Sequence, residues 1–161
     1  MKAKNGEHPL GDAAQLILFA LFVVIWILDS FILHRTTFLA EYIPLILRLI
    51  ILGFALGAAV YLFKSGHVVV SGEQSPTMVV ASGVFRYVRH PLYLGSILIY
   101  LGLTVSTASL FCLALLVVIV LFYNYIAAYE EKLLEEKMGE TYIAYEKKTG
   151  KWIPGIGKKR Q

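Results

Sequence analysis

The fold is decided by the stretch LYLGSILIYLGLTVSTASLFCLALLVVIVLFYNYIAAY, residues 92–129, which contains no charged side chain. As a single α-helix this segment would measure roughly 57 Å, nearly twice the ~30 Å hydrocarbon core of a bilayer. It is therefore expected to fold back on itself as a helical hairpin. The turn is predicted at TVSTAS, residues 104–109, because hydroxyl side chains bond freed backbone groups and helix preference is weak there.

Two further apolar stretches, residues 13–33 and 42–63, are each long enough to cross a bilayer. With the hairpin helices, expected at 92–104 and 109–129, they give four transmembrane helices. The composition agrees, because 58% hydrophobic residues and a mean hydropathy of +0.69 exceed the values of ordinary soluble domains. We expect an all-α integral membrane protein that forms a single domain over residues 1–161.

Basic residues between the spans predict the orientation. One side of the membrane would hold both termini and a cytoplasmic loop at 64–91, whereas the other side shows only Arg35. The first side carries Lys2, Lys4, Lys64, Arg86, Arg89 and the basic C-terminal tail. Both termini are therefore predicted to be cytoplasmic, and the loop is expected to contain extended or re-entrant pieces.

The net charge of +4 does not indicate a nucleic-acid partner. The basic residues lie between and after apolar blocks, rather than on a stripe interleaved with aromatic residues. They are typical of membrane flanks, so the expected partners are membrane lipid and a lipophilic small molecule.

Three features inside the spans invite structural interpretations. Gly53 and Gly57 share one face of the second span, which predicts close helix packing. Asp29 and Arg48 lie at similar depth near the non-cytoplasmic ends of their helices. They could form a buried ion pair, or each could extend independently to the interface.

After Tyr129 the chain becomes highly charged, with the sequence EEKLLEEKMGETYIAYEKKTGKWIPG. Apolar side chains still recur at helical spacing, which predicts an amphipathic C-terminal helix with a break at Gly139. Glu135 and Glu136 are expected on its solvated face. Trp152 and the basic residues that follow it are expected to anchor the tail to anionic headgroups: Lys158, Lys159 and Arg160.

Polar residues are expected to meet at the cytoplasmic end of the hairpin. Arg89 and His90 precede its first helix, and Glu130 and Glu131 follow the apolar part of its second. An isolated basic pair is usually an anchor, and an isolated acidic pair is usually solvated. Together, with Pro91 in the first turn of a helix, they indicate the wall of a polar pocket.

This two-part pattern, RHPLYLG followed by an apolar hairpin and then EEKLLEEKMGETYIAYEKKTGKWIP, resembles the isoprenylcysteine carboxyl methyltransferase family. That family is related in plan to the phosphatidylethanolamine N-methyltransferases. The resemblance covers residues 83–154. The matching residues are Arg89, His90, Pro91, Tyr93, Gly95, Glu130, Glu131, Leu134, Gly139, Tyr142, Tyr145 and Pro154.

The resemblance implies a membrane-embedded methyltransferase that uses S-adenosylmethionine (SAM) and a lipophilic acceptor. It implies no metal and leaves the catalytic residues unassigned. The residues that it suggests for cofactor binding are Arg89, His90, Pro91, Tyr93, Gly95, Glu130, Glu131, Tyr142 and Tyr145.

The chemistry of SAM is compatible with this set, because the cofactor carries a sulfonium, an ammonium and a carboxylate. Arg89 or His90 would meet the carboxylate or the adenine edge. Glu130 or Glu131 would meet the ammonium or the ribose hydroxyls. The remaining task of the protein is to align the reactants and exclude water.

The acceptor and two rival functions stay open at this level. Family members that act on prenylated cysteine commonly carry an arginine one turn before the acidic pair, where this chain has Ile126. A lipid amine, thiol or hydroxyl is therefore as reasonable an acceptor as a carboxylate. The rival functions are an NADPH-dependent membrane reductase of the sterol reductase type and a non-catalytic membrane module.

Overall fold

The computed structural model of the chain describes residues 11–72 and 82–155, and this part is built from helices joined by short turns. The helices are α1 (Gly11–Ile27), η1 (Leu28–Leu33), η2 (Phe38–Glu41), α2 (Leu45–Gly72), η3 (Gly83–Arg86), α3 (Pro91–Thr107), α4 (Leu110–Met138) and α5 (Glu140–Lys148). Element η1 is a π-helix, whereas η2 and η3 are 3₁₀-helices. The all-α prediction is confirmed.

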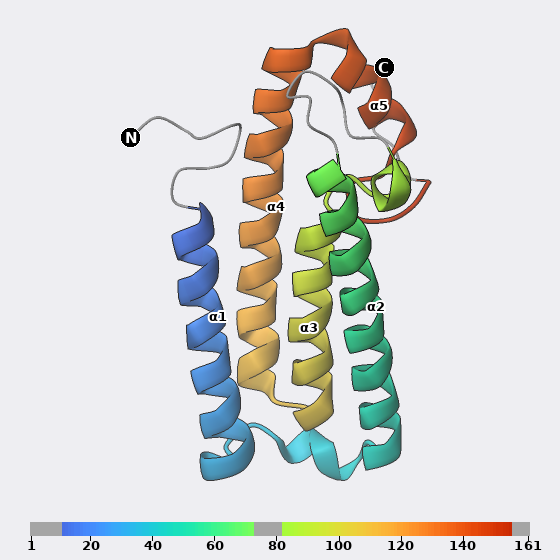
Figure 1. Ribbon diagram of the computed structural model, residues 1–161. Coiled ribbons are helices and arrows are strands. Elements are labelled where there is room, and N and C mark those ends of the chain that lie inside the picture. Colours follow the sequence, from blue (N-terminus) through green and yellow to red (C-terminus); the bar gives the residue numbers. More distant parts are fainter. Residues whose placement is uncertain (1–10, 73–81, 156–161) are drawn as a thin grey trace.

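Helices α1 to α4 run side by side as a bundle, and α5 caps one end of it (Figure 1). Elements η1 and η2 lie at the other end. By length and composition three helical stretches can cross a membrane: Ala13–Leu33, Leu45–His67 and Leu110–Met138. Helix α3 is apolar but shorter, with 17 residues. The chain is thus a multi-pass membrane protein, as predicted.

The hairpin turn lies where the sequence predicts it. Helix α3 ends at Thr107, and Ala108 adopts a left-handed conformation with φ of 53°. The Ser109 hydroxyl then accepts a hydrogen bond from the backbone N–H of Cys112, which caps the start of α4. The expectation that hydroxyl side chains satisfy the turn is confirmed.

Two predicted boundaries are wrong because helices continue into polar sequence. Helix α4 runs to Met138 rather than ending at residue 129, since Glu, Lys and Leu favour a helix until Gly139. Helix α2 extends to Gly72, so residues 64–72 are helical rather than part of a loop. Leu92 packs closely on Gly66 of α2. A Cβ added to Gly66 would lie 2.8 Å from the Leu92 side chain. The rest of the predicted loop, residues 73–81, lies outside the described residues.

Close packing between α2 and α3 uses small residues other than the predicted pair. A Cβ on Gly102 would lie 3.1 Å from the side chain of Ala55, and Ala59 is almost completely buried. Gly53 and Gly57 instead face open space, with nothing within 4 Å of an added Cβ. The predicted face does not pack within the chain, because the contact face lies two residues further along a helix of 3.6 residues per turn. Close packing of Gly53 and Gly57 in a dimer, the other use of this face, stays a prediction.

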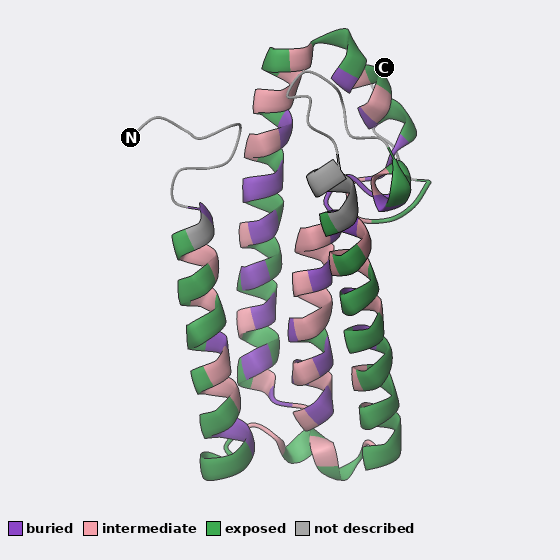
Figure 2. Ribbon diagram, in the orientation of Figure 1, coloured by how far each residue is buried: buried purple, intermediate pink, exposed green. Residues whose placement is uncertain are grey.

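The core lies where α1, α3 and α4 meet, and the outward faces of α1 and α2 are exposed (Figure 2). Its buried members are Phe22, Tyr100, Cys112, Leu116, Ile119 and Tyr123. Many exposed side chains are large and apolar, including Leu16, Ile46, Phe54 and Leu121. This distribution suits a bundle surrounded by lipid rather than by water.

Asp29 and Arg48 do not pair with each other in the described part of the chain. The buried Asp29 carboxylate accepts four hydrogen bonds: from Arg35 N (3.0 Å), Thr36 N (3.0 Å), Thr36 Oγ1 (2.5 Å) and Ser109 Oγ (2.6 Å). The Arg48 guanidinium donates to three backbone carbonyls, those of Ala40, Ile43 and Ser106. The predicted ion pair is therefore wrong, because each charge is satisfied by neutral groups of adjacent turns. Buried Asp29 does not extend to the interface either, whereas for the half-buried Arg48 this alternative stays a prediction.

Candidate active site

The two halves of the sequence motif meet at the α5 end of the bundle. His90 precedes α3, and Glu131 lies on the polar extension of α4. Only 3.1 Å separates His90 Nε2 from Glu131 Oε1, although the two residues are 41 positions apart. The predicted convergence of basic and acidic side chains is present.

Local structure fixes His90 at the mouth of α3. It is the N-cap residue, with φ of −124° and ψ of 63°, and Pro91 follows at the first helical position. Proline fits this position because its missing N–H has no partner in the first turn anyway. Val88 forms an isolated parallel bridge with Gly150, which holds the preceding backbone against the C-terminal segment.

The His90 ring lies between two carboxylates and two aromatic rings. Nδ1 is 3.7 Å from Glu130 Oε2, in addition to the contact of Nε2 with Glu131. The ring stacks on Tyr93, with centroids 5.7 Å apart and planes 6° apart. The ring centroid of Trp152 lies 5.8 Å from that of His90. These neighbours restrict the orientation of the imidazole.

Glu130 is the more accessible of the two acidic residues. Its side chain is 16% exposed, compared with 9% for Glu131. The Tyr93 hydroxyl donates to Glu130 Oε1 at 2.5 Å, and the Tyr93 ring lies 5.2 Å from that of Tyr123 in the core. The Glu130–Tyr93 pair thus joins the polar site to the apolar bundle.

Arg89 is buried, and its guanidinium is occupied by protein groups. Nε donates to Glu131 Oε1 at 2.9 Å, Nη1 donates to the carbonyls of Glu146 and Thr149 at 2.9 Å each, and Nη2 lies 3.5 Å from Glu146 Oε1. Its backbone N–H donates to the Gly150 carbonyl at 2.9 Å. Arg89 therefore lies in the expected region, but its donors are directed toward Glu131 and the C-terminal segment.

Three residues of this region escaped the sequence-based prediction: Glu146, Lys151 and Trp152. Glu146 is 1% exposed and pairs with Arg89. Lys151 Nζ lies 3.4 Å from Glu131 Oε2, and Trp152 Nε1 donates to Asn124 Oδ1 at 3.3 Å. Trp152 thus packs on the site, and its role as a headgroup anchor stays a prediction. Lys158, Lys159 and Arg160, predicted to share that role, lie outside the described residues.

Tyr142 and Tyr145 lie on α5, on the side that faces η3 and the site. Burial raises the pKa of the Tyr142 phenol, and burial raises the pKa of Tyr145 to about 12. The Tyr145 hydroxyl donates to the Phe85 carbonyl at 2.6 Å. Both tyrosines are therefore neutral, and their contacts hold α5 in place.

Pro91 and Gly95 contact helix α2. A Cβ on Gly95 would lie 3.2 Å from Phe63, and the Pro91 ring approaches Gly66. Both residues are buried. Their position in the motif is explained by close approach of α2 to the start of α3.

Glu135 and Glu136 differ, although both were expected to be solvated. Glu136 is exposed, whereas Glu135 is half-buried and interacts with other groups. The expectation of a fully solvated side chain is therefore wrong for Glu135.

The charges of the site do not balance. The contacting groups include three carboxylates, Glu130, Glu131 and Glu146, and two permanent cations, Arg89 and Lys151. Counted without His90, which can bind a proton, these side chains sum to about −1, so carboxylates outnumber the permanent cations.

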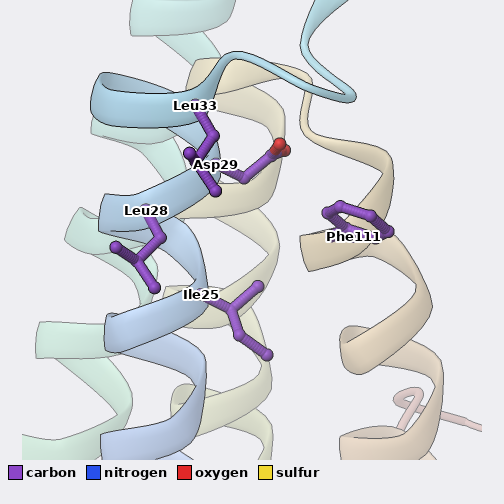
Figure 3. Close-up of a pocket in the computed structure, with 5 residues that line it drawn as sticks. All are labelled: Ile25, Leu28, Asp29, Leu33 and Phe111. Carbon is purple, nitrogen blue, oxygen red and sulfur yellow. The ribbon is translucent and has the colours of Figure 1, made fainter.

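A cavity of about 160 Å³ lies at the opposite end of the bundle (Figure 3). Four of its lining side chains are apolar: Ile25, Leu28, Leu33 and Phe111. The fifth is Asp29, whose oxygens already accept four hydrogen bonds. This cavity has no charged group available to a ligand. Among residues 11–72 and 82–155, no cluster of three or more His, Cys, Asp or Glu side chains could hold a metal ion.

Comparison with known proteins agrees with this architecture. Residues 42–141, more than half of the chain, match the family described as phospholipid methyltransferase. The chain is 34% identical over 92 residues to the protein-S-isoprenylcysteine O-methyltransferase of Schizosaccharomyces pombe, covering 56% of this chain and 39% of that relative. It is 30% identical over 166 aligned positions to the methanethiol S-methyltransferase of Crocosphaera subtropica, covering 94% and 55%. No solved structure matches.

The chain therefore belongs to the phospholipid methyltransferase family of integral-membrane proteins. The resemblance predicted from the RHPLYLG and EE motifs is confirmed by the match and by its two methyltransferase relatives. The chain spans 39% and 55% of the lengths of these relatives.

Proposed function

We propose that this chain is a SAM-dependent methyltransferase that methylates a lipophilic acceptor at the α5 end of the bundle. The observation that carries the proposal is the acidic cluster around His90, assembled from both halves of the motif. Two methyltransferase relatives support the reaction class.

The residues present fit SAM by charge. At neutral pH the cofactor carries an ammonium, a sulfonium and a carboxylate, so its net charge is about +1. Glu130 and Glu131 both contact His90, and their carboxylates are suited to the ammonium and ribose hydroxyls of such a ligand. An excess of carboxylates disfavours the phosphates of NADPH, which argues against the reductase alternative.

The site residues have separate tasks in this proposal. When bound, SAM supplies an activated methyl group: its carbon–sulfur bond breaks as the acceptor heteroatom bonds to that carbon, and a neutral thioether leaves. Glu130 takes the proton of a protonated acceptor, directly or through Tyr93, to which it is hydrogen-bonded. Trp152 and Tyr93 flank His90 and exclude water.

The acceptor is proposed to be neutral or cationic rather than a carboxylate. Arg89 and Lys151 are already bound to Glu131, and the position one turn before Glu130 is the buried Ile126. A carboxylate acceptor would meet two acidic residues without a cation to offset them. A lipophilic thiol, amine or hydroxyl fits better.

Binding measurements test the proposal directly. Purified protein in detergent or nanodiscs should bind S-adenosylhomocysteine in a calorimetric titration and should not bind NADPH. His90→Ala and Glu130→Gln should each weaken this binding about ten- to a hundredfold, because each removes a charged or hydrogen-bonding partner. Binding of NADPH alone would favour the reductase, and binding of neither ligand would favour a non-catalytic module.

The matched control is Glu136→Gln, an exposed carboxylate of the same helix. It removes the same charge within two turns of Glu130 but should bind like the wild type. Equal losses in all three variants would assign the effect to general electrostatics and overturn the role of the pocket.

We also propose that the site faces the cytoplasm. Lys64 lies in the second half of α2, Arg86 in η3 and Arg89 just before α3, and these segments meet at the α5 end of the bundle (Figure 1). Arg35 lies between η1 and η2, which are at the opposite end. A reporter fused to the C-terminus should then report a cytoplasmic location. A signal from the other side of the membrane would reverse the orientation and with it the compartment of the cofactor.

A further inference from the structure

We infer that Glu146 is a positioning residue, which acts through Arg89 to hold residues 149–152 over the His90–Glu131 site. Residues 149–152 are called the covering segment below. The structural part of this inference stands independently, whereas its effect on ligand binding rests on the proposed function.

The first step concerns the direction of the chain after α4. Gly139 has φ of 58° and ψ of −132°, a conformation that other residues rarely adopt. Figure 1 shows α5 turning back here and descending beside η3. The reversal brings the end of α5 next to the beginning of α3.

The second step is the lock at the end of α5. Helix α5 ends at Lys148, and Arg89 donates to the carbonyls of Glu146 and Thr149 there. A guanidinium suits a helix C-terminus because it satisfies free carbonyls and the negative end of the dipole. Glu146 adds a buried carboxylate 3.5 Å from the same guanidinium. These contacts fix the orientation of the Arg89 guanidinium.

The third step is what the lock holds in place. The covering segment begins at Thr149, directly after the locked turn, and its Gly150 carbonyl accepts from the Arg89 N–H. Lys151 then reaches Glu131, and Trp152 covers the His90 ring. One arginine therefore joins the site carboxylate, the end of α5 and the covering segment.

The consequence is a division of labour between two buried carboxylates on one guanidinium. Glu131 contacts His90, Lys151 and Arg89, so it belongs to the site. Glu146 contacts Arg89 through Nη2, whereas Glu131 contacts it through Nε. Neutralising Glu146 removes the ionic partner of Nη2 and keeps the hydrogen bonds of Nε and Nη1, so it should weaken the lock without removing a carboxylate of the His90–Glu130–Glu131 group. The covering segment then loosens while the bundle remains folded.

The test uses Trp152 as its own reporter. The chain contains two tryptophans, so Trp26→Phe leaves Trp152 as the single emitter. In this background Glu146→Gln should shift the emission to longer wavelength and raise hydrogen exchange in peptides covering 149–152. Peptides from α1 to α4 should exchange as in the parent. S-adenosylhomocysteine should dissociate about tenfold faster or more.

Two further variants keep the test decisive. Glu140→Gln removes an exposed charge from the first turn of the same helix and should change none of these readouts. Asn124→Ala removes the acceptor of the Trp152 indole without touching a buried charge, so it should loosen the covering segment in the same direction, even if Glu146→Gln proves unstable. Unchanged emission and exchange in a folded Glu146→Gln protein would overturn the inference, and so would unchanged emission and exchange in Asn124→Ala if Glu146→Gln does not fold. Failure of the wild type to bind S-adenosylhomocysteine would overturn the proposed function and leave the emission and exchange results valid.

Discussion

Two buried carboxylates at opposite ends of the bundle are satisfied in different ways. Asp29 accepts from two backbone N–H groups and two hydroxyls, all of them neutral. Glu131 instead contacts Arg89, His90 and Lys151, which are cations or can become cations. Neutral donors fix one conformation of the carboxylate. A carboxylate paired with charged side chains can instead exchange them for the charged groups of a ligand. Burial of an acidic residue in this membrane protein thus does not by itself indicate a binding site, and its partners make the distinction.

The largest expected effect comes from Glu131→Gln, which should change both stability and binding. The substitution leaves Arg89 and Lys151 without a shared carboxylate in a buried setting, at a cost of roughly 3 kcal/mol in the free energy of unfolding. S-adenosylhomocysteine binding should fall at least about tenfold. Thermal unfolding in detergent and calorimetry on the same sample measure the two effects together.

Asp29→Asn should affect stability alone. The amide nitrogen would face groups that are all donors, so about 2 kcal/mol of stability should be lost. Because the site lies at the other end of the bundle, the folded fraction should bind S-adenosylhomocysteine like the wild type. Altered affinity in the folded fraction would contradict the separation of the two ends.

The smallest effect concerns the neutral phenol of Tyr145 at high pH. Burial raises its pKa from 10.0 to about 12 in the folded protein, so the stability that it contributes is fully present below pH 10 and is lost as the pH approaches 12. Tyr145→Phe should unfold with a flatter dependence on pH across this window. Melting curves of the two proteins measured from pH 9 to 12 give the comparison. If stability depends on pH equally in both, the raised pKa does not belong to Tyr145.

The sequence supports the prediction of features that depend on local length and charge. An uncharged stretch of 38 residues, 92–129, cannot cross a bilayer once, so the hairpin follows from length alone. The hairpin in turn brings His90 close to Glu131. These inferences need only the pattern of apolar and charged residues, and both agree with the structure.

Features that depend on direction could not be predicted in the same way. Helical periodicity does not say which face of α2 meets α3, so Ala55 and Ala59 were missed in favour of Gly53 and Gly57. Nor does it say where the chain points after Gly139. The partners of Arg89 that follow Gly139, among them Glu146, depend entirely on that turn. Their charge pattern alone is typical of a solvated helix.

The length of α4 sets the height at which the proposed reaction takes place. The helix has 29 residues, or roughly 43 Å, so it exceeds the ~30 Å hydrocarbon core by more than two turns. Glu130 lies 20 residues after Leu110, roughly 30 Å along the axis, which corresponds to the level of the lipid headgroups. If a molecule lies wholly among the acyl chains and its nucleophile is in its middle, that nucleophile does not reach the level of Glu130. Acceptors of the proposed reaction are therefore amphiphiles or small molecules that carry the reactive atom at the water-facing end.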